Sequence, residues 1–199
     1  MTDSVPVRVG KRERLADAAA RVFHEQGVEK TTIADIARVA EVPVGNVYYY
    51  FKTKDQLIQA AIGAHARTAR EVLAELERYE TPAQRLQALV RGWVEQRETA
   101  VRFGCPSGTL ATELDKRADG LDEELAAVMR ELLGWIEAQF AAMGRADARE
   151  LAVALLASYQ GISLLTNTFR DPGLMEAEGR RLVAWIDSLE AVTSRTADR

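Results

Sequence analysis

The residues best suited to chemistry lie between positions 32 and 54, where polar and aromatic side chains crowd a helical pattern. An asparagine can hydrogen-bond a base or a phosphate, phenol hydroxyls donate to phosphates, and a valine can meet a thymine methyl group. A glycine lets the helix backbone approach a base edge closely because it has no Cβ. These groups predict contact with DNA rather than catalysis. The candidate contact residues are Thr32, Val44, Gly45, Asn46, Tyr48, Tyr49, Tyr50, Lys52 and Lys54.

The three consecutive tyrosines cannot all face the same way, because successive helix residues are about 100° apart. We expect Tyr48 and Tyr49 to face the DNA. Tyr50 fits packing and contact equally well, since half-buried aromatic rings with a wet hydroxyl are common. Lys52 and Lys54 place positive charge beyond the helix, where a following helix N-terminus also favours phosphate.

Two short helices joined by a tight turn must position these side chains. The first repeats apolar residues at the three-and-four spacing of one helix face. Residues 40–42 form the turn, and Pro43 can open the second helix because the first turn leaves its N–H unpaired. The second helix needs only Val47 and Phe51 as inward anchors. This arrangement predicts a helix-turn-helix with its recognition helix in the major groove.

The order of parts over residues 10–60 resembles the TetR family of bacterial transcriptional regulators. An amphipathic first helix is followed by TTIADIA, VPVGNVYYYF and KTKDQL. The resemblance implies a small DNA-binding domain, a larger helical domain for ligand and dimerisation, and neither catalysis nor a cofactor. It also implies that Gly45 reads bases and that Tyr48, Tyr49, Tyr50 and Lys54 hold the DNA backbone.

One position departs from the family pattern. The position of Val44 often carries a side chain that hydrogen-bonds a base, which valine cannot do. We therefore expect sequence reading to depend on Asn46, Thr32, thymine contact and DNA shape.

The rest of the chain predicts an all-α protein of about nine helices. Of 199 residues, 47% are hydrophobic, and 5 prolines and 13 glycines leave room for long helices. Strand-like alternation and internal repeats are absent from the sequence. We expect a DNA-binding domain over 1–53 and a ligand-binding and dimerisation domain over 54–199. A fourth helix over roughly 54–79 would join them without a linker.

Helix boundaries follow from capping and breaking residues. Thr32 with Asp35 has the spacing of a capping box, and Thr81-Pro82 is a strong helix start. The expected helices outside the helix-turn-helix span roughly 11–26, 54–79, 82–103, 106–116, 121–143, 147–169 and 174–192.

Charge and targeting signals exclude several classes of protein. The net charge is −4, with +1 over residues 1–64 and −5 over the remainder, which suits a binder of specific sites rather than a DNA-coating protein. The sequence has neither a long apolar run nor a secretory segment, and its one cysteine fits a reducing compartment. We expect a cytoplasmic protein. His24 and His65 lack metal-ligand neighbours, so no metal site is predicted.

Aromatic and polar residues of the later helices are candidates for an effector cavity. Such a cavity is mostly apolar and orients its ligand with few polar groups. Plain core packing is the competing interpretation for each aromatic residue. The candidates are Trp93, Phe103, Cys105, Trp135, Phe140, Tyr159 and Asn167, with Ser158, Gln160 and Ser163 as further polar groups.

The last two helices are apolar enough to predict a four-helix interface in a homodimer, although burial within one chain is the alternative. Two-fold symmetry would place two recognition helices about one turn of a near-palindromic operator apart. The expected interface residues are Leu151, Leu155, Ile162, Leu165, Leu182, Trp185, Ile186 and Leu189.

Cys105 lies in the segment FGCPSGTLATEL, at the start of a helix and three residues after Arg102. The helix N-terminus and the positive charge of Arg102 both favour the thiolate form of Cys105. The segment resembles a TetR subgroup that includes repressors of multidrug pumps and a sensor of electrophiles and bleach. A small, buried packing role is the favoured interpretation of a lone cysteine.

These features predict a ligand-responsive repressor that a small apolar or aromatic effector releases from its operator. A redox or electrophile switch through Cys105 is the alternative. An activator would carry the same signals, because the sign of regulation depends on operator position. An enzyme is not expected, since the sequence has no nucleophile–base pair, phosphate loop or metal cluster.

Overall fold

The computed structural model describes residues 10–117 and 119–197. The expected domain ranges also include residues 1–9, 118 and 198–199, which lie outside the described residues. The described residues form helices without strands, which confirms the all-α class. The helices are α1 (Lys11–Gln26), α2 (Ile33–Val39), α3 (Val44–Tyr50), α4 (Lys54–Leu76), α5 (Pro82–Glu95), α6 (Arg97–Phe103), α7 (Pro106–Leu114), α8 (Leu121–Ala142), α9 (Ala148–Phe169) and α10 (Pro172–Ala197).

The single helix expected over 82–103 is wrong in its middle. Gln96 adopts φ −88° and ψ 9°, and its N–H donates to the Trp93 carbonyl three residues back at 3.2 Å. This tighter turn ends α5 and lets α6 begin in a new direction. The described residues therefore form ten helices where about nine were expected.

Local capping explains where several helices begin. Thr32 accepts from the Asp35 N–H and the Asp35 carboxylate accepts from the Thr32 N–H, which confirms the capping box at α2. Thr81 and Gln84 form a second capping box at α5. The Asp147 side chain, expected to cap α9, makes no such bond and instead accepts two hydrogen bonds from Arg145.

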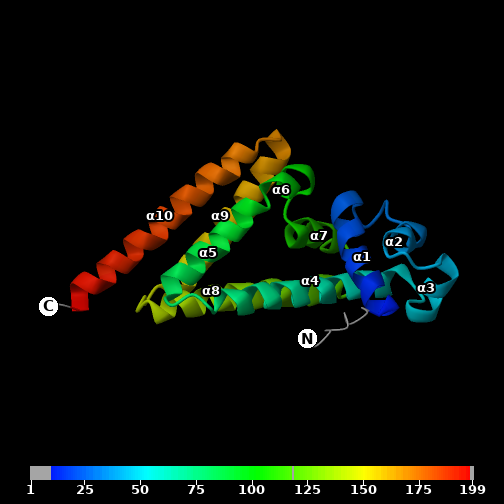
Figure 1. Cartoon of the computed structure of the whole chain (residues 1–199), viewed down its shortest axis with the longest axis horizontal. Coiled ribbons are helices and arrows are strands. Elements are labelled where there is room, and N and C mark those ends of the chain that lie inside the picture. The colour runs from blue at the N-terminus through cyan, green and yellow to red at the C-terminus, as the bar shows by residue number, and fades with distance from the viewer. Residues whose placement is uncertain (1–9, 118, 198–199) are drawn as a thin grey trace, which may run out of the picture.

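Helix α4 connects the two ends of the molecule. Its 23 residues span about 35 Å at 1.5 Å per residue. It starts beside α1 and runs away from the N-terminal helices, alongside α8 (Figure 1). Leu57, Ile58 and Ala61 are fully buried near its start, whereas Leu73 and Leu76 are buried near its end.

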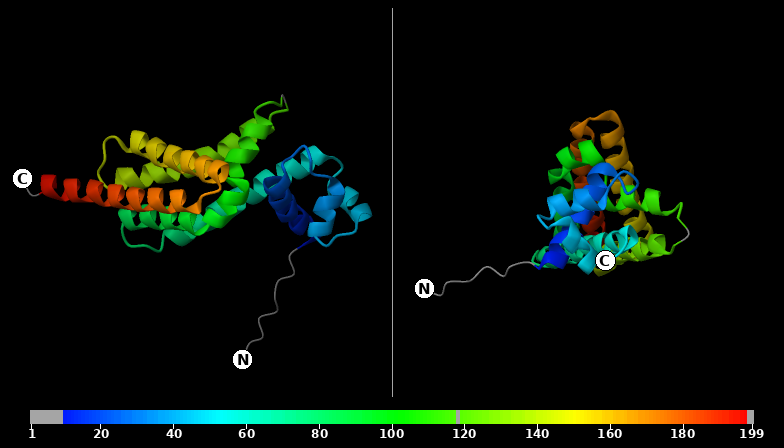
Figure 2. Two further views of the ribbon diagram at one scale, coloured as in Figure 1. Left: turned by 90° about the horizontal axis from the view of Figure 1, so that it is seen from above. Right: turned by 90° about the vertical axis from the view of Figure 1, so that its right-hand side faces the viewer.

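Two hydrophobic cores hold the fold together. The first contains α1, α2, α3 and the start of α4, together with Leu110 and Leu114 of α7 and Leu121 and Leu125 of α8. The second joins the end of α4 to α5, α8, α9 and α10. Figure 2 shows the small helical unit at one end and the long helices of the second core at the other. Side chains from the middle of the sequence thus complete the core of the N-terminal unit.

Among the described residues, no helix has the length and apolar character needed to cross a membrane.

Candidate nucleic-acid interface and effector cavity

Helix α3 presents a polar and aromatic face to solvent. Its inward anchors are Val47, which is fully buried, and Phe51, which is 3% exposed, as predicted. Tyr49 is 79% exposed and Tyr48 47% exposed, so both phenols face outward. The space around a Cβ built on Gly45 is open for 4 Å. The helix can therefore lie against a flat or grooved partner along this face.

The turn before α3 is held in an unusual backbone conformation. Glu41 has φ 53°, in the left-handed region that costs a non-glycine residue energy. Pro43 lies one residue outside the helix as its N-cap, whereas the sequence placed it in the first turn. The Asn46 N–H donates to the Pro43 carbonyl at 2.8 Å, and the Asn46 side chain is exposed. This turn leaves Val44 and Asn46 at the exposed start of the helix.

Tyr50 has the packing role that the sequence left open. Its ring is half-buried against the first core and meets the Tyr49 ring edge-on, with centroids 5.0 Å apart. This ring contact restricts the movement of the exposed Tyr49 side chain. Tyr50 thus helps to hold the neighbouring phenol in its exposed position.

Two lysines flank α3 but differ in their surroundings. The Lys52 side chain is exposed, whereas the Lys54 ammonium donates to the Glu29 carbonyl at 3.1 Å. Thr53 caps α4 by accepting from the Gln56 N–H at 3.2 Å. Lys52 and Lys54 place positive charge at the N-terminus of α4, which attracts anions.

The exposed side chain of Thr32 is already used in the protein. Its hydroxyl donates to the Asp35 carboxylate at 2.6 Å and accepts from the Asp35 N–H. The pKa of Asp35 is lowered, first by its hydrogen bonds from Thr32. A base contact by this hydroxyl would compete with the cap of α2.

A cavity of about 530 Å³ lies between α4, α5, α7, α8 and α9 and opens to solvent beside the exposed residues Thr68, Val72 and Gln96. Four of the predicted cavity residues line it: Trp93, Cys105, Tyr159 and the polar Gln160. The Trp93 and Tyr159 rings stack with centroids 4.2 Å apart and form a flat wall. Apolar side chains from α4, α5 and α8 cover most of the remainder, namely Val72, Leu73, Leu76, Leu89, Val128, Met129 and Leu132.

Uncharged polar groups occur in the same lining. They are His65, Thr68, Gln96, Ser107 and Gln160. Burial lowers the pKa of His65 to about 4, with the nearby His24 as a second cause. Burial likewise raises the pKa of the Tyr159 phenol, and the adjacent Cys105 adds to the rise. Both groups are therefore neutral near pH 7, and the lining charges Arg91 and Glu95 are on exposed residues.

Six predicted cavity residues lie outside this lining, namely Ser158, Ser163, Phe103, Trp135, Phe140 and Asn167. Phe140 is fully buried in the second core, and its ring packs on the Trp185 ring with centroids 5.8 Å apart. Phe103 instead meets the rings of His24 and the guanidinium of Arg102. Trp135 donates from Nε1 to Glu77 at 2.7 Å, and Asn167 donates to the Val101 carbonyl at 3.0 Å. Trp135, Phe140 and Asn167 lie on helices that line the cavity, but their side chains are on other faces of those helices.

The cavity wall on α4 was missed by the sequence analysis. His65 and Thr68 lie on α4, and Met129 and Leu132 lie on α8. The available signal was a histidine within an otherwise apolar stretch that includes Ala61, Ile62 and Ala64. That signal was used only to exclude a metal site. In the described residues, no group of three histidine, cysteine or acidic side chains is placed to hold a metal ion.

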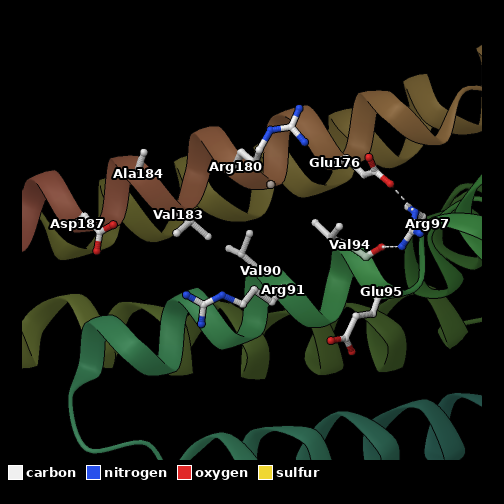
Figure 3. Close-up of a pocket in the computed structure, with 11 residues that line it drawn as sticks. Val90, Arg91, Val94, Glu95, Arg97, Glu176, Arg180, Val183, Ala184 and Asp187 are labelled. Carbon is white, nitrogen blue, oxygen red and sulfur yellow. Dashed lines mark hydrogen bonds and ion pairs between the residues drawn. The ribbon is translucent and has the colours of Figure 1, made fainter.

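A second hollow of about 540 Å³ lies between α5 and α10 (Figure 3). Val90, Val94 and Val183 point into it, and the Arg97–Glu176 ion pair at 2.8 Å closes one end. Its lining carries equal numbers of positive and negative side chains, namely Arg91, Arg97 and Arg180 against Glu95, Glu176 and Asp187. The hollow between α5 and α10 has no aromatic side chain in its lining. The cavity lined by Trp93 and Tyr159 is therefore the better fit for an apolar effector.

Cys105 is buried at the junction of α6 and α7. Its Sγ accepts from the Gly108 N–H at 3.4 Å and from Gln160 Nε2 at 3.5 Å. Cys105 therefore caps α7 and joins it to α9 while lining the cavity. These contacts are those of a small, buried side chain at a helix start.

The outer face of α9 remains apolar and exposed in the single chain. Leu164 is 65% exposed, Val153 and Leu165 are also exposed, and Ala157 and Gly161 lie between them at helical spacing. Several residues expected in a dimer interface are instead in the second core of the chain, namely Leu155, Leu182 and Ile186. Leu165 of the predicted interface is on this exposed face, whereas those three residues pack within the chain.

Comparison with known proteins identifies the class of protein that this geometry defines. Residues 15–61 match the family described as "Bacterial regulatory proteins, tetR family". Residues 82–180 match "Transcriptional regulator LmrA/YxaF-like, C-terminal domain".

Relatives and solved structures agree with both matches. The HTH-type transcriptional regulator LmrA of Bacillus subtilis is 27% identical over 171 residues, which cover 80% of this chain and 88% of that protein. The regulator BetI of Rhizobium meliloti is 38% identical over 87 residues, 43% of this chain and 41% of that protein. A TetR regulator from Legionella pneumophila superposes with a TM-score of 0.80 at 17% identity, covering 92% of this chain and 98% of that chain.

The chain belongs to the TetR family of transcriptional regulators. It is a DNA-binding regulator with a helix-turn-helix, and not an enzyme.

Proposed function

We propose that the protein is a homodimeric repressor, released from a near-palindromic operator by a small, uncharged apolar or aromatic effector. The observation that carries this proposal is the exposed face of α3, where Val44, Asn46, Tyr48 and Tyr49 extend from a helix anchored by buried side chains. A rigid scaffold with free polar and aromatic groups is suited to direct readout of a groove. Such a regulator works in the cytoplasm, where bacterial DNA lies.

DNA docking would use the start of α3 and the start of α4 together. The open backbone at Gly45 allows close approach to base edges, with Asn46 as the hydrogen-bonding group beside it. Tyr48, Tyr49 and Lys52 would contact phosphates on either side of the groove. Lys54 would act mainly through its charge at the α4 N-terminus, since its ammonium already bonds to Glu29.

Dimerisation would cover the exposed apolar face of α9. Large apolar patches on a folded chain mark interaction surfaces. The alternation of leucine and valine with Ala157 and Gly161 allows a second copy of the helix to approach closely. A two-fold axis near α9 would present two copies of α3 to two half-sites of one operator.

The effector class follows from the neutral lining of the cavity. In the buried part of the cavity an ion would lose its hydration without gaining a charged partner, because His65 and Tyr159 are neutral near pH 7 and the lining charges Arg91 and Glu95 are on exposed residues. An aromatic ligand can stack on the wall formed by Trp93 and Tyr159. A hydroxyl or carbonyl group on that ligand can bond to His65, Ser107 or Gln160.

Helix α4 would be the lever between effector and DNA. Its middle lines the cavity at His65, Thr68 and Val72, and its first turns pack against α1 in the N-terminal unit. The effector must bind the DNA-incompetent arrangement more tightly than the competent one, because equal affinity shifts nothing.

The test of the proposed function is binding to labelled DNA from upstream of the protein's own gene, followed by selection from random DNA if that fragment fails. We expect two chains per operator by sedimentation. The logarithm of the binding constant should fall linearly with the logarithm of salt concentration, because phosphate contacts release counterions. One chain per site would remove the dimer from the proposal, and failure of both DNA sources would remove operator binding.

A matched set of naphthalene probes tests the effector class. We expect 2-naphthol to bind at least about tenfold more tightly than 2-naphthoate or 2-naphthylmethylammonium at pH 7, since a buried ion without a partner is costly. Calorimetry measures the affinities, and the operator assay measures release. His65→Leu should bring 2-naphthol close to plain naphthalene, while naphthalene itself is unaffected. Tighter binding of either ion would contradict the neutral class.

A further inference from the structure

Helix α7 reaches from the cavity wall into the N-terminal core. Pro106 and Ser107 in its first turn line the cavity. Leu110 and Leu114, farther along the same helix, are buried with α1, α2 and α4 in the first core. The helix has 9 residues, so one rigid element touches both compartments. This is a second physical connection between them, besides α4.

The Glu113 carboxylate attaches α7 to the loop after α1. Its Oε2 accepts from the Val28 N–H at 2.6 Å. A Cβ on Gly27 would lie 3.2 Å from the same oxygen, so the glycine permits this close approach. The Val28 residue is 5% exposed, and a buried N–H without an acceptor is costly. The carboxylate therefore supplies an acceptor that the loop itself does not provide.

This loop leads directly into the helix-turn-helix. The Thr31 hydroxyl donates to the Gly27 carbonyl at 2.7 Å, and Lys54 donates to the Glu29 carbonyl. Thr32 then starts α2 through its capping box with Asp35. The loop is thus bonded within itself at Gly27, to α7 at Val28 and to α4 at Glu29. A displacement of α7 relative to α4 would pull on the loop at Val28 and change the placement of α2 and α3.

We infer that Glu113 is a positioning residue for DNA binding, which fixes the loop at Gly27–Val28 so that α3 fits its operator, and that α7 carries displacement of the cavity wall to this point. The inference rests on the proposed function. Other polar contacts between the second half of the chain and the N-terminal unit include a partly buried one between the His24 ring and the Gly104 carbonyl at 3.0 Å, and exposed side-chain pairs such as Gln59 with Glu124 at 2.8 Å. Contacts between mobile, solvated side chains transmit position poorly compared with a bond to a buried backbone group.

The experiment compares Glu113→Ala, Glu113→Gln and the control Glu124→Ala in the full-length protein. Operator affinity is measured by fluorescence anisotropy at a temperature where circular dichroism shows each variant folded. We expect Glu113→Ala to weaken operator binding about tenfold, because a charge-assisted hydrogen bond to a buried amide is lost. Glu113→Gln should restore most of the affinity, since its amide oxygen can accept the same bond. Glu124→Ala should stay within about twofold.

Hydrogen exchange supplies a readout that does not depend on DNA. The Val28 amide should exchange faster in Glu113→Ala than in the wild type and in Glu113→Gln, with α4 and α9 unchanged. Unchanged Val28 protection overturns the inference even if DNA binding is present. Faster exchange without any DNA binding in the wild type would instead place the failure in the proposed function. Equal operator affinities of Glu113→Ala and the wild type also overturn the positioning role.

A large side chain introduced into the cavity by substitution tests whether α7 transmits displacement of the cavity wall to the loop at Val28. Ser107→Trp places an indole in the cavity at the first turn of α7. We expect this change to weaken operator binding in the wild-type background by at least about fivefold, and by less than about twofold when Glu113 is already alanine, because coupled sites are not additive. Equal fold-changes in the two backgrounds, or no change in either, would remove α7 from the route.

Discussion

Tyr49→Ala is expected to weaken operator binding by roughly a hundredfold without changing the stability of the protein. Tyr49 is the most exposed aromatic side chain of α3, and its hydroxyl is free to donate to a phosphate. A hydrogen bond to a charged acceptor contributes about 1.5 kcal/mol or more. A dimer makes the contact twice, so about 3 kcal/mol is lost, which is about a hundredfold in affinity. Anisotropy titration with the operator measures the change.

Three controls identify the origin of this loss. Tyr49→Phe keeps the ring and its contact with Tyr50, so a similar loss in that variant assigns the effect to the hydroxyl. Tyr79→Ala removes an exposed tyrosine just beyond the far end of α4 and should leave affinity unchanged. The slope of affinity against salt should stay the same in Tyr49→Ala, because a neutral side chain releases no counterion, whereas Lys52→Ala should reduce it. Full affinity in Tyr49→Ala would contradict the proposed docking face.

Phe140→Ala is expected to lower the free energy of unfolding by about 3–5 kcal/mol, the range for removing a buried aromatic ring. The Phe140 side chain is fully buried and packs on Trp185 in the second core. The surrounding helices α8, α9 and α10 pack against one another in this core, so they cannot move inward to fill the space that alanine leaves. Urea denaturation followed by circular dichroism measures the loss, at fixed protein concentration because a dimer makes stability concentration-dependent.

The same variant separates a core role from a ligand-binding role. If Phe140 lined the effector cavity, as its type and helix suggested, alanine would enlarge an existing space at little cost and would change 2-naphthol affinity. We expect the opposite, a large loss of stability with probe affinity unchanged at a temperature where the variant is folded. Phe140→Leu should recover most of the lost stability, since it refills much of the volume.

The sequence carried most of the information about the DNA-binding unit. Val47 and Phe51 could be identified as anchors because a seven-residue helix has few ways to bury two large side chains. Thr32 and Asp35 could be identified as a cap because capping depends on neighbours three residues apart. In both cases the interacting groups are close in the sequence, so spacing alone determines the geometry.

The second half of the chain was harder because its helices have more than one apolar face. The spacing of Trp135, Phe140 and Asn167 indicates helices but not which neighbour each face meets. Their positions depend on contacts with residues far away in the chain: Trp135 with Glu77, Phe140 with Trp185 and Asn167 with Val101. The cavity residues of α4 were missed for the same reason, since His65 and Thr68 become a wall only when α7, α8 and α9 lie opposite.

The first core has a consequence for engineering. Leu110, Leu114, Leu121 and Leu125 complete the N-terminal unit although they follow residue 53 by about a third of the chain. A chimaera joined after residue 53, as practised for interchangeable modules, would leave those four leucines facing a foreign surface. Exchange of DNA specificity within this scaffold is better made by substituting the outward residues of α3 alone, or by transferring α7 and the start of α8 together with α1 to α4.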